Sequence, residues 1–336
     1  MNGYPDDVTR PLIIGHRGAP GYRPEHTRSS YELAIQMGVD AVEPDVVVSR
    51  DGVLVIRHEN ELSTTTDVAD RPEFADRRTT RRIDGLEHVG WFTEDFAWDE
   101  LATLRCRERI PGIRPASADV DDQEPPLRLR DLLVLLDEHR AGGRDVIPVV
   151  EIKHATYFAS QGWDLAALLD DELRAAGWRG RRVVIESFEL TVLRQLRARV
   201  ARADLVFLLE MEGAPVDQVA VLGSDARGYA DWLRPDGVEL LAAEVHGISL
   251  DKTVVLAPDA DGRATGPAAV VAQAQERGLA VFAWTCRPEN AFLIPEFRTG
   301  GLAEYGNWRG EWGVLRRAGL DGVFVDHPDL GVAYFA

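Results

Sequence analysis

Two carboxylates lie two positions apart in an apolar stretch at residues 41–48. They are Glu43 and Asp45, with Pro44 between them. Successive side chains of an extended strand point to opposite faces, so both carboxylates point the same way. Paired carboxylates repel each other and raise each other's pKa unless a cation lies between them. Because hard divalent ions prefer oxygen ligands, this spacing indicates a site for Ca²⁺ or Mg²⁺.

Two histidines end other apolar stretches. Residues 11–14 run into His16 and Arg17, and residues 53–56 run into His58. Two histidines that flank a metal can serve as general acid and general base near neutral pH. Arg17 adds a planar positive fork that suits a phosphate. Together with the carboxylates, these residues indicate metal-assisted attack on a phosphate ester.

A further apolar strand, at residues 145–153, ends in Glu151 and Lys153. The two residues are again two apart and share a face. The residues alone leave two interpretations open: an internal Glu–Lys ion pair, or part of a site at the end of a barrel strand, where barrel enzymes place catalytic residues. His154 is expected on the opposite face, in a structural role.

Several of these elements, in this order, resemble the glycerophosphodiester phosphodiesterase family, whose pattern is H-R, E-x-D and H-D. The matching residues are His16-Arg17-Gly18, Pro24-Glu25-His26-Thr27, Glu43-Pro44-Asp45-Val46, Asp51-Gly52 and Val55-Ile56-Arg57-His58. The chain departs from the pattern at two positions. His26 stands where many members have Asn, and Glu59 stands where many have Asp. Both changes keep a polar side chain.

The resemblance implies roles for the residues that match. The metal ligands would be Glu43, Asp45 and Glu151, and the catalytic residues His16 and His58. The expected substrate-binding residues are Arg17 and Lys153 at the phosphate, Trp284 of a W-T motif, and Phe188. The implied reaction is cleavage of glycerophosphodiesters to sn-glycerol 3-phosphate and an alcohol, with Ca²⁺ or Mg²⁺ as cofactor. The closing Asp326-His327-Pro328 matches a D-x-P element and is expected to be structural.

Hydrophobic periodicity predicts the elements that position these residues. A helix at 27–37, closed by Gly38, joins the strands at 11–14 and 41–48, which makes a parallel crossover unit. Further helices are predicted at 129–140, 164–176, 189–200, 216–222, 267–277 and 311–318. With the intervening strands they give about eight strand–helix units, the number of a TIM (β/α)8 barrel.

The 336 residues are expected to form a single TIM-barrel domain, 1–336, with an insertion after the third strand. The insertion is residues 60–126, a polar stretch that is too long for a plain barrel connection. By resemblance it should form a subdomain over the barrel mouth. One short helix is expected within it, at 99–104, and its acidic run at 119–124 is expected to be a solvated turn.

The net charge of −18 argues against a nucleic-acid binder and against adsorption to anionic membranes. No stretch approaches the roughly 20 apolar residues that span a bilayer. The polar segment 1–10 lacks the apolar core of a signal peptide, so a cytoplasmic location is expected. The two cysteines are expected to be reduced. The expected partner is a small-molecule substrate, and the sequence does not indicate an oligomeric state.

Three other functions are weighed against this one. The first is a phospholipase D-like enzyme on lysophospholipids, but the insertion has few contiguous apolar residues to hold a lipid tail. The second is a non-catalytic phosphate-binding barrel, although every matched catalytic position is filled. The third is a barrel glycosidase that uses two carboxylates, which leaves both histidines and Lys153 unexplained.

Overall fold

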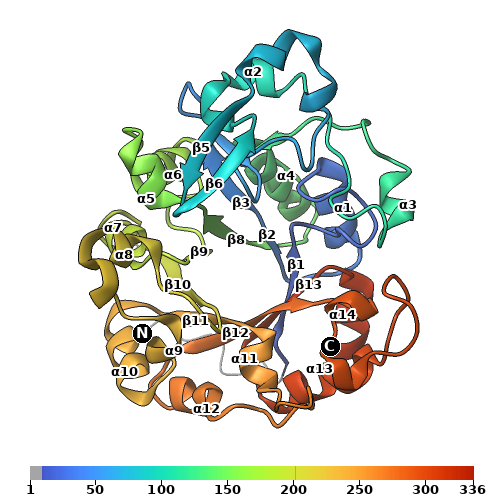
Figure 1. Ribbon diagram of the computed structural model, residues 1–336, viewed down its shortest axis with the longest axis vertical. Helices are drawn as coiled ribbons and strands as arrows, with labels where there is room; N and C mark the ends of the chain where they lie inside the picture. Colours follow the sequence, from blue (N-terminus) through green and yellow to red (C-terminus); the bar gives the residue numbers. More distant parts are fainter. Residues whose placement is uncertain (1–9, 201) are drawn as a thin grey trace.

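Eight parallel strands close into a barrel in the computed structural model, which describes residues 10–200 and 202–336 (Figure 1). In chain order they are β1 (Leu12–His16), β2 (Ala41–Glu43) continued by β3 (Asp45–Val48), β8 (Ile147–Ile152), β9 (Val183–Ser187), β10 (Ala203–Leu209), β11 (Gly247–Asp251), β12 (Ala280–Cys286) and β13 (Gly322–Val325). β1 pairs with both β13 and β2, and β2 pairs with β8, so the ring has no free edge. The predicted TIM barrel is confirmed.

The strand that carries the paired carboxylates is interrupted at Pro44, because proline has no amide hydrogen to donate. The register with β8 continues across the break: Val42 lies opposite Pro148, and Asp45 lies opposite Glu151. The Glu151 amide donates to the Pro44 carbonyl at 3.0 Å. The unchanged register brings Glu43 and Asp45 to the same side of the barrel wall, as their spacing predicts.

The predicted third strand is not a barrel strand. β4 (Leu54–Ile56) pairs antiparallel with β3 and with β7 (Leu127–Arg128). Only residues 49–53 join β3 to β4, whereas a parallel crossover needs a dozen residues or more. This short link is a turn in which Gly52 takes a φ of +81°, so the chain reverses. The insertion therefore follows the second barrel strand rather than the third.

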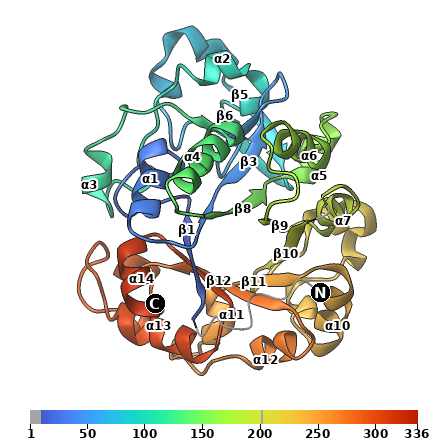
Figure 2. The same cartoon turned by 180° about the vertical axis from the view of Figure 1, so that it is seen from behind.

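Helices surround the ring of strands in both views (Figures 1 and 2). Those that overlap the predicted ranges are α1 (Arg28–Gln36), α4 (Leu129–Ala141), α6 (Leu165–Ala175), α7 (Leu190–Arg199), α8 (Val216–Leu222), α12 (Ala269–Gln275) and α13 (Trp308–Arg317). The others outside the insertion are α5 (Ala155–Ser160), α9 (Tyr229–Trp232), α10 (Pro235–Glu244), α11 (Lys252–Leu256) and α14 (Pro328–Phe335). In the described residues, no helix is both long and apolar enough to cross a membrane.

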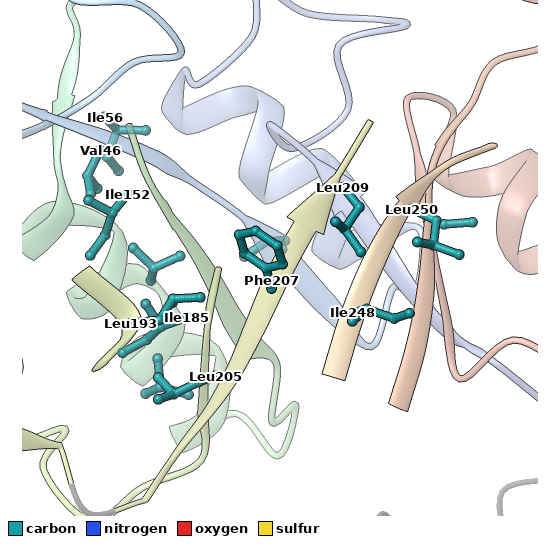
Figure 3. Packing of buried hydrophobic residues seen from close by; sticks show 14 of the residues in the cluster. Val46, Ile56, Ile152, Ile185, Leu193, Leu205, Phe207, Leu209, Ile248 and Leu250 are labelled. Atoms are coloured by element: carbon teal, nitrogen blue, oxygen red, sulfur yellow. The ribbon is translucent and has the colours of Figure 1, made fainter. Parts of the chain in front are cut away.

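The barrel wall separates two apolar layers. The inner layer comprises Ile14, Ala41, Val149, Val184, Val206, Ala280, Phe282 and Phe324. The outer layer fills the space between strands and helices, and Figure 3 shows part of it, including Ile152 and Phe207. Side chains alternate along a strand, so residues two or four positions beyond an inner-layer residue also face inward. This alternation sets which residues can meet at the carboxyl ends of the strands.

The insertion lies on the side of α1 and α4 in both views (Figures 1 and 2). It contains the short helices α2 (Trp98–Leu101) and α3 (Pro115–Ala118) and a hairpin of β5 (Thr79–Ile83) and β6 (Leu86–Gly90). The expected helix near 99–104 corresponds to α2. The hairpin was not predicted, because its strands are largely exposed and lack apolar alternation. The expected signal-free segment 1–10 lies, except for Arg10, outside the described residues.

Candidate active site

Polar residues replace apolar ones where the inward-facing positions reach the carboxyl ends of the strands. On five strands these residues are His16, Glu43 with Asp45, Glu151 with Lys153, Trp284 and Asp326. The ends of parallel strands meet at one face of a barrel, which is where barrel enzymes hold their active sites. A cavity of about 710 Å³ opens there, and its lining includes both predicted histidines, Glu43 and Glu151.

Three buried carboxylates meet at the base of this cavity. Glu43, Asp45 and Glu151 each offer an oxygen, and these oxygens all lie within 4.8 Å of one another. Glu43 Oε1 and Asp45 Oδ1 are buried without a hydrogen-bond partner. Burial and the two neighbouring carboxylates raise the pKa of Glu43 well above its usual value, and burial raises that of Glu151 to about 8. Unpartnered oxygens in this arrangement fit a hard divalent cation.

Two cationic side chains, Lys153 and Arg17, and the imidazole of His26 lie against the triad. Lys153 Nζ lies 2.7 Å from Glu151 Oε1 and 3.9 Å from Asp45 Oδ1. Arg17 Nε lies 3.4 Å from Asp45 Oδ2, and His26 Nε2 lies 2.9 Å from the same oxygen. Burial alone would raise the pKa of Asp45, but Lys153 and the other cationic neighbours hold it well below its usual range. Asp45 is therefore the ionised member of the triad.

His16 is held by a buried carboxylate. Its Nδ1 lies 2.6 Å from Asp326 Oδ1, and the other oxygen of Asp326 accepts from Arg114 at 2.7 Å and Arg287 at 2.6 Å. Burial, and then the charge of Arg17, lower the pKa of His16 to about 4. Asp326 was expected to be structural, whereas it lies directly behind a predicted catalytic histidine. A carboxylate at Nδ1 leaves the Nε2 lone pair free on the cavity side.

His58 has the same kind of support. Its Nδ1 lies 2.5 Å from Glu59 Oε1, and its Nε2 lies 3.2 Å from Lys153 Nζ. Arg109 donates to both oxygens of Glu59, at 2.9 and 2.7 Å, and to both oxygens of Glu25, at 2.8 and 2.7 Å. Burial, and then Arg17, lower the pKa of His58 to about 3. Each histidine is thus neutral, with a carboxylate at Nδ1 and an arginine behind the carboxylate.

The two supporting arginines come from the insertion, and sequence reasoning missed both. Arg109 lies 50 residues from Glu59, and Arg114 lies 212 residues from Asp326, so no local spacing connects them. His154 was expected to face away from the site, but it lines the cavity. It has a φ of 53°, and this left-handed turn redirects its side chain; its Nδ1 lies 2.5 Å from Asp84 Oδ2 at the hairpin tip.

Both predicted aromatic residues line the cavity. The Phe188 and Trp284 rings meet edge to face, with centroids 5.8 Å apart. Tyr229, which was not predicted, contacts Phe188 with centroids 6.2 Å apart. The structure therefore brings all nine predicted site residues to one end of the barrel. Eight of them line the cavity, and Asp45 lies beneath it in the carboxylate triad.

Comparison with known proteins gives a consistent result. Residues 16–330 match the model of the Glycerophosphoryl diester phosphodiesterase family. The chain is 32% identical over 333 residues to a glycerophosphodiester phosphodiesterase of Arabidopsis thaliana, which covers 96% of this chain and 85% of that protein. A phosphodiesterase of Oleispira antarctica, solved in complex with the product sn-glycerol-3-phosphate, has a TM-score of 0.59 at 19% identity and covers 97% of this chain and 96% of its own. A glycerophosphoryl diester phosphodiesterase structure from Silicibacter pomeroyi has a TM-score of 0.67 at 20% identity and covers 99% of this chain and 94% of its own.

Proposed function

The chain belongs to the glycerophosphoryl diester phosphodiesterase family, and we propose that it hydrolyses glycerophosphodiesters to sn-glycerol 3-phosphate and an alcohol with a divalent metal, Ca²⁺ or Mg²⁺. The observation that carries this proposal is the meeting of three buried carboxylates, two carboxylate-supported histidines and the cationic side chains of Arg17 and Lys153 at one cavity. The product named with the Oleispira structure supports the substrate class.

The site residues form two groups, one that would bind the metal and one that would bind the phosphate. Glu43, Asp45 and Glu151 would hold the ion. When bound, it would supply a Lewis acid that stabilises negative charge on a phosphate oxygen. Arg17 and Lys153 line the same cavity and would also stabilise this negative charge. Such electrostatic stabilisation is strongest where water is excluded. Both cations also neutralise the buried carboxylates, so they remain charged while substrate binds.

The two histidines would move the protons. In each histidine the Nδ1 atom contacts a carboxylate, which leaves Nε2 to exchange a proton with the substrate. In His58 this Nε2 lies 3.2 Å from Lys153 Nζ, which substrate would displace. One histidine removes a proton from the nucleophile, and the other gives a proton to the leaving oxygen. The nucleophile is either water or the glycerol 2-hydroxyl, and the second choice passes through a cyclic phosphate. Detection of a cyclic glycerol phosphate in a rapid-quench experiment distinguishes the two.

Product analysis tests the reaction. Glycerophosphocholine should yield glycerol 3-phosphate and choline, with oxygen from labelled water ending on the phosphate. Lysophosphatidylcholine should be hydrolysed far more slowly, because the insertion has few contiguous apolar residues to hold a lipid tail. Faster turnover of the lysolipid would favour the phospholipase D-like alternative. Binding of the diester without any turnover would favour the non-catalytic barrel.

Metal affinity is expected to rise with pH. The pKa of Glu151 is about 8 without metal and that of Glu43 is also raised, so these carboxyls hold protons at pH 6 that a metal must displace. Each proton released strengthens binding by up to about tenfold per pH unit. Calorimetry in buffers of different ionisation enthalpy, between pH 6 and pH 8, measures the metal affinity and the number of protons released. A pH-independent affinity with no proton release would contradict the triad assignment.

The insertion is proposed to act in catalysis through Arg109. Its replacement by alanine removes the clamp on Glu59 and Glu25, so His58 loses its fixed orientation. We expect kcat to fall by about 10- to 100-fold, as for other residues that orient a catalytic group. Arg109→Lys should recover only part of the loss, because lysine lacks the planar fork.

Arg107→Ala is the matched control for this change. Arg107 lies two residues away in the same insertion, and its guanidinium donates to the surface carboxylates Asp70 and Asp122. Steady-state kinetics with a thermal-unfolding check separate the two variants. Equal losses in both would show that the insertion contributes stability rather than positioning.

A further inference from the structure

A fourth carboxylate, Glu186, stands beside the triad and belongs to neither the metal group nor the phosphate group of residues. It lies on β9, where its Cα pairs in register with that of Glu151 on β8. It is two positions beyond Val184 of the inner layer, so the alternation of the strand turns its side chain inward. The side chain lines the cavity. Glu186 therefore continues the row of carboxylates around the barrel wall.

One buried oxygen of Glu186 has no hydrogen-bond partner. The residue is only 2% exposed, and the unpartnered atom is Oε2. Glu186 is close enough to exchange electrostatic interactions with Glu151 and Asp45, and it also acts on Glu43. Lys153 is the cation that acts on Glu186, but its Nζ already lies 2.7 Å from Glu151 Oε1. A buried carboxylate without a counter-charge is unfavourable, and a bound cation removes this penalty.

The balance of charges indicates which kind of cation the site lacks. With Glu186, four buried carboxylates meet at the base of the cavity. Arg17 and Lys153 are the cationic side chains that lie against them, and Arg17 also contacts Glu25. The imidazole of His26 adds no charge at pH 8. Four negative charges thus face two positive ones, and the excess equals the charge of one divalent ion. Without Glu186 the excess would be only half as large.

The position of Glu186 distinguishes between the two candidate ions. The triad oxygens lie within 4.8 Å of one another, and Glu186 stands outside this group on the neighbouring strand. Mg²⁺ demands short distances in near-ideal octahedral geometry, and it usually keeps several waters beside one or two carboxylates. Ca²⁺ accepts about six to eight oxygens at longer distances and in flexible geometry. A fourth, more distant carboxylate therefore strengthens the binding of Ca²⁺ more than that of Mg²⁺.

From these observations we propose that Glu186 is a fourth carboxylate of the metal site and makes the site select Ca²⁺ over Mg²⁺. The triad would hold either ion, and Glu186 would complete the negative charge and favour the larger ion. This inference rests on the proposed metal-dependent hydrolysis and names the ion that it uses.

Calorimetric titration of the EDTA-treated protein with Ca²⁺ and with Mg²⁺, at pH 8 and without substrate, tests this role. We expect the wild type to bind Ca²⁺ at least about tenfold more tightly than Mg²⁺. Glu186→Gln keeps the size of the side chain and should weaken Ca²⁺ binding about 10- to 100-fold. Mg²⁺ binding should weaken far less, so most of the preference should disappear. Glu186→Asp keeps the charge and should bind Ca²⁺ more tightly than Glu186→Gln.

Glu210→Gln is the matched control, because Glu210 lines the same cavity and loses the same charge but is exposed, just after β10. It should keep the wild-type affinities for both ions. Equal Ca²⁺ affinities in the wild type and Glu186→Gln, or equal losses in Glu186→Gln and Glu210→Gln, would overturn the role of Glu186. Either result would leave the triad and the hydrolase assignment intact.

The wild type gives a second, independent decision if Glu186→Gln does not fold. Tighter binding of Ca²⁺ than of Mg²⁺ supports the selection of Ca²⁺. Equal affinities, or tighter binding of Mg²⁺, would overturn it. Binding of neither ion would contradict the triad itself, and with it the metal dependence of the proposed hydrolysis.

Discussion

Replacing His58 or His16 by alanine is expected to lower kcat by about 10²- to 10⁴-fold, the usual contribution of a positioned acid or base. Each imidazole has its Nδ1 on a carboxylate and its Nε2 toward the cavity, so each loss removes one proton transfer. KM should change much less, because Arg17 and Lys153 remain to bind the phosphate. Steady-state kinetics on a glycerophosphodiester measure both constants.

The leaving group distinguishes the two histidines. A diester of glycerol 3-phosphate with p-nitrophenol needs little protonation of its leaving oxygen, so the variant that lacks the general acid should recover most of its rate with this substrate. The variant that lacks the base should not recover. His139→Ala is a control on the outer helix α4, since His139 does not line the cavity. Wild-type rates in both His16→Ala and His58→Ala would exclude the proposed acid–base pair.

Glu43→Gln is expected to abolish tight metal binding and with it almost all activity. The substitution keeps the side-chain volume but removes one of the three carboxylates that could hold the metal. The effect of Glu43→Gln on the unfolding temperature should have opposite signs in the metal-free and the metal-bound protein. The pKa of Glu43 is raised in the folded protein, so its ionisation at pH 8 opposes folding when no metal is present. The metal-free variant should therefore unfold at a higher temperature than the metal-free wild type.

With saturating Ca²⁺ or Mg²⁺ the order should reverse, because only the wild type gains the free energy of metal binding. Thermal unfolding at pH 8, with chelator and with metal, measures this crossover. A variant that is less stable than wild type under both conditions would show that Glu43 has a structural role. A variant that binds metal as tightly as wild type would remove it from the ligand set.

The alternation of strand side chains made much of the site predictable. Glu43 and Asp45 share a face, and so do Glu151 and Lys153, and the structure places all four at one end of the barrel. The fold class followed from the strand–helix spacing and from the family resemblance, and both are confirmed. These features depend on local sequence, which a single chain reveals.

The parts that were not predicted depend on contacts that are distant in sequence. Arg109 and Arg114 of the insertion bind the carboxylates behind His58 and His16 on the barrel. No sequence pattern near either arginine indicates this contact. The reversal at β4 was missed because an apolar run has the same appearance in parallel and antiparallel pairing. His154 was misplaced because a left-handed backbone breaks the strand alternation at that residue.

The most direct measurement is glycerol 3-phosphate release from glycerophosphocholine and glycerophosphoglycerol, before and after removal of metal with EDTA and after restoration with Ca²⁺ or Mg²⁺. His16→Ala serves as the inactive control. We predict release that is lost with chelator, regained with one of the two ions and absent in the variant. Release that persists without metal would contradict the carboxylate triad as a metal site, and no release with either ion would contradict the diesterase assignment.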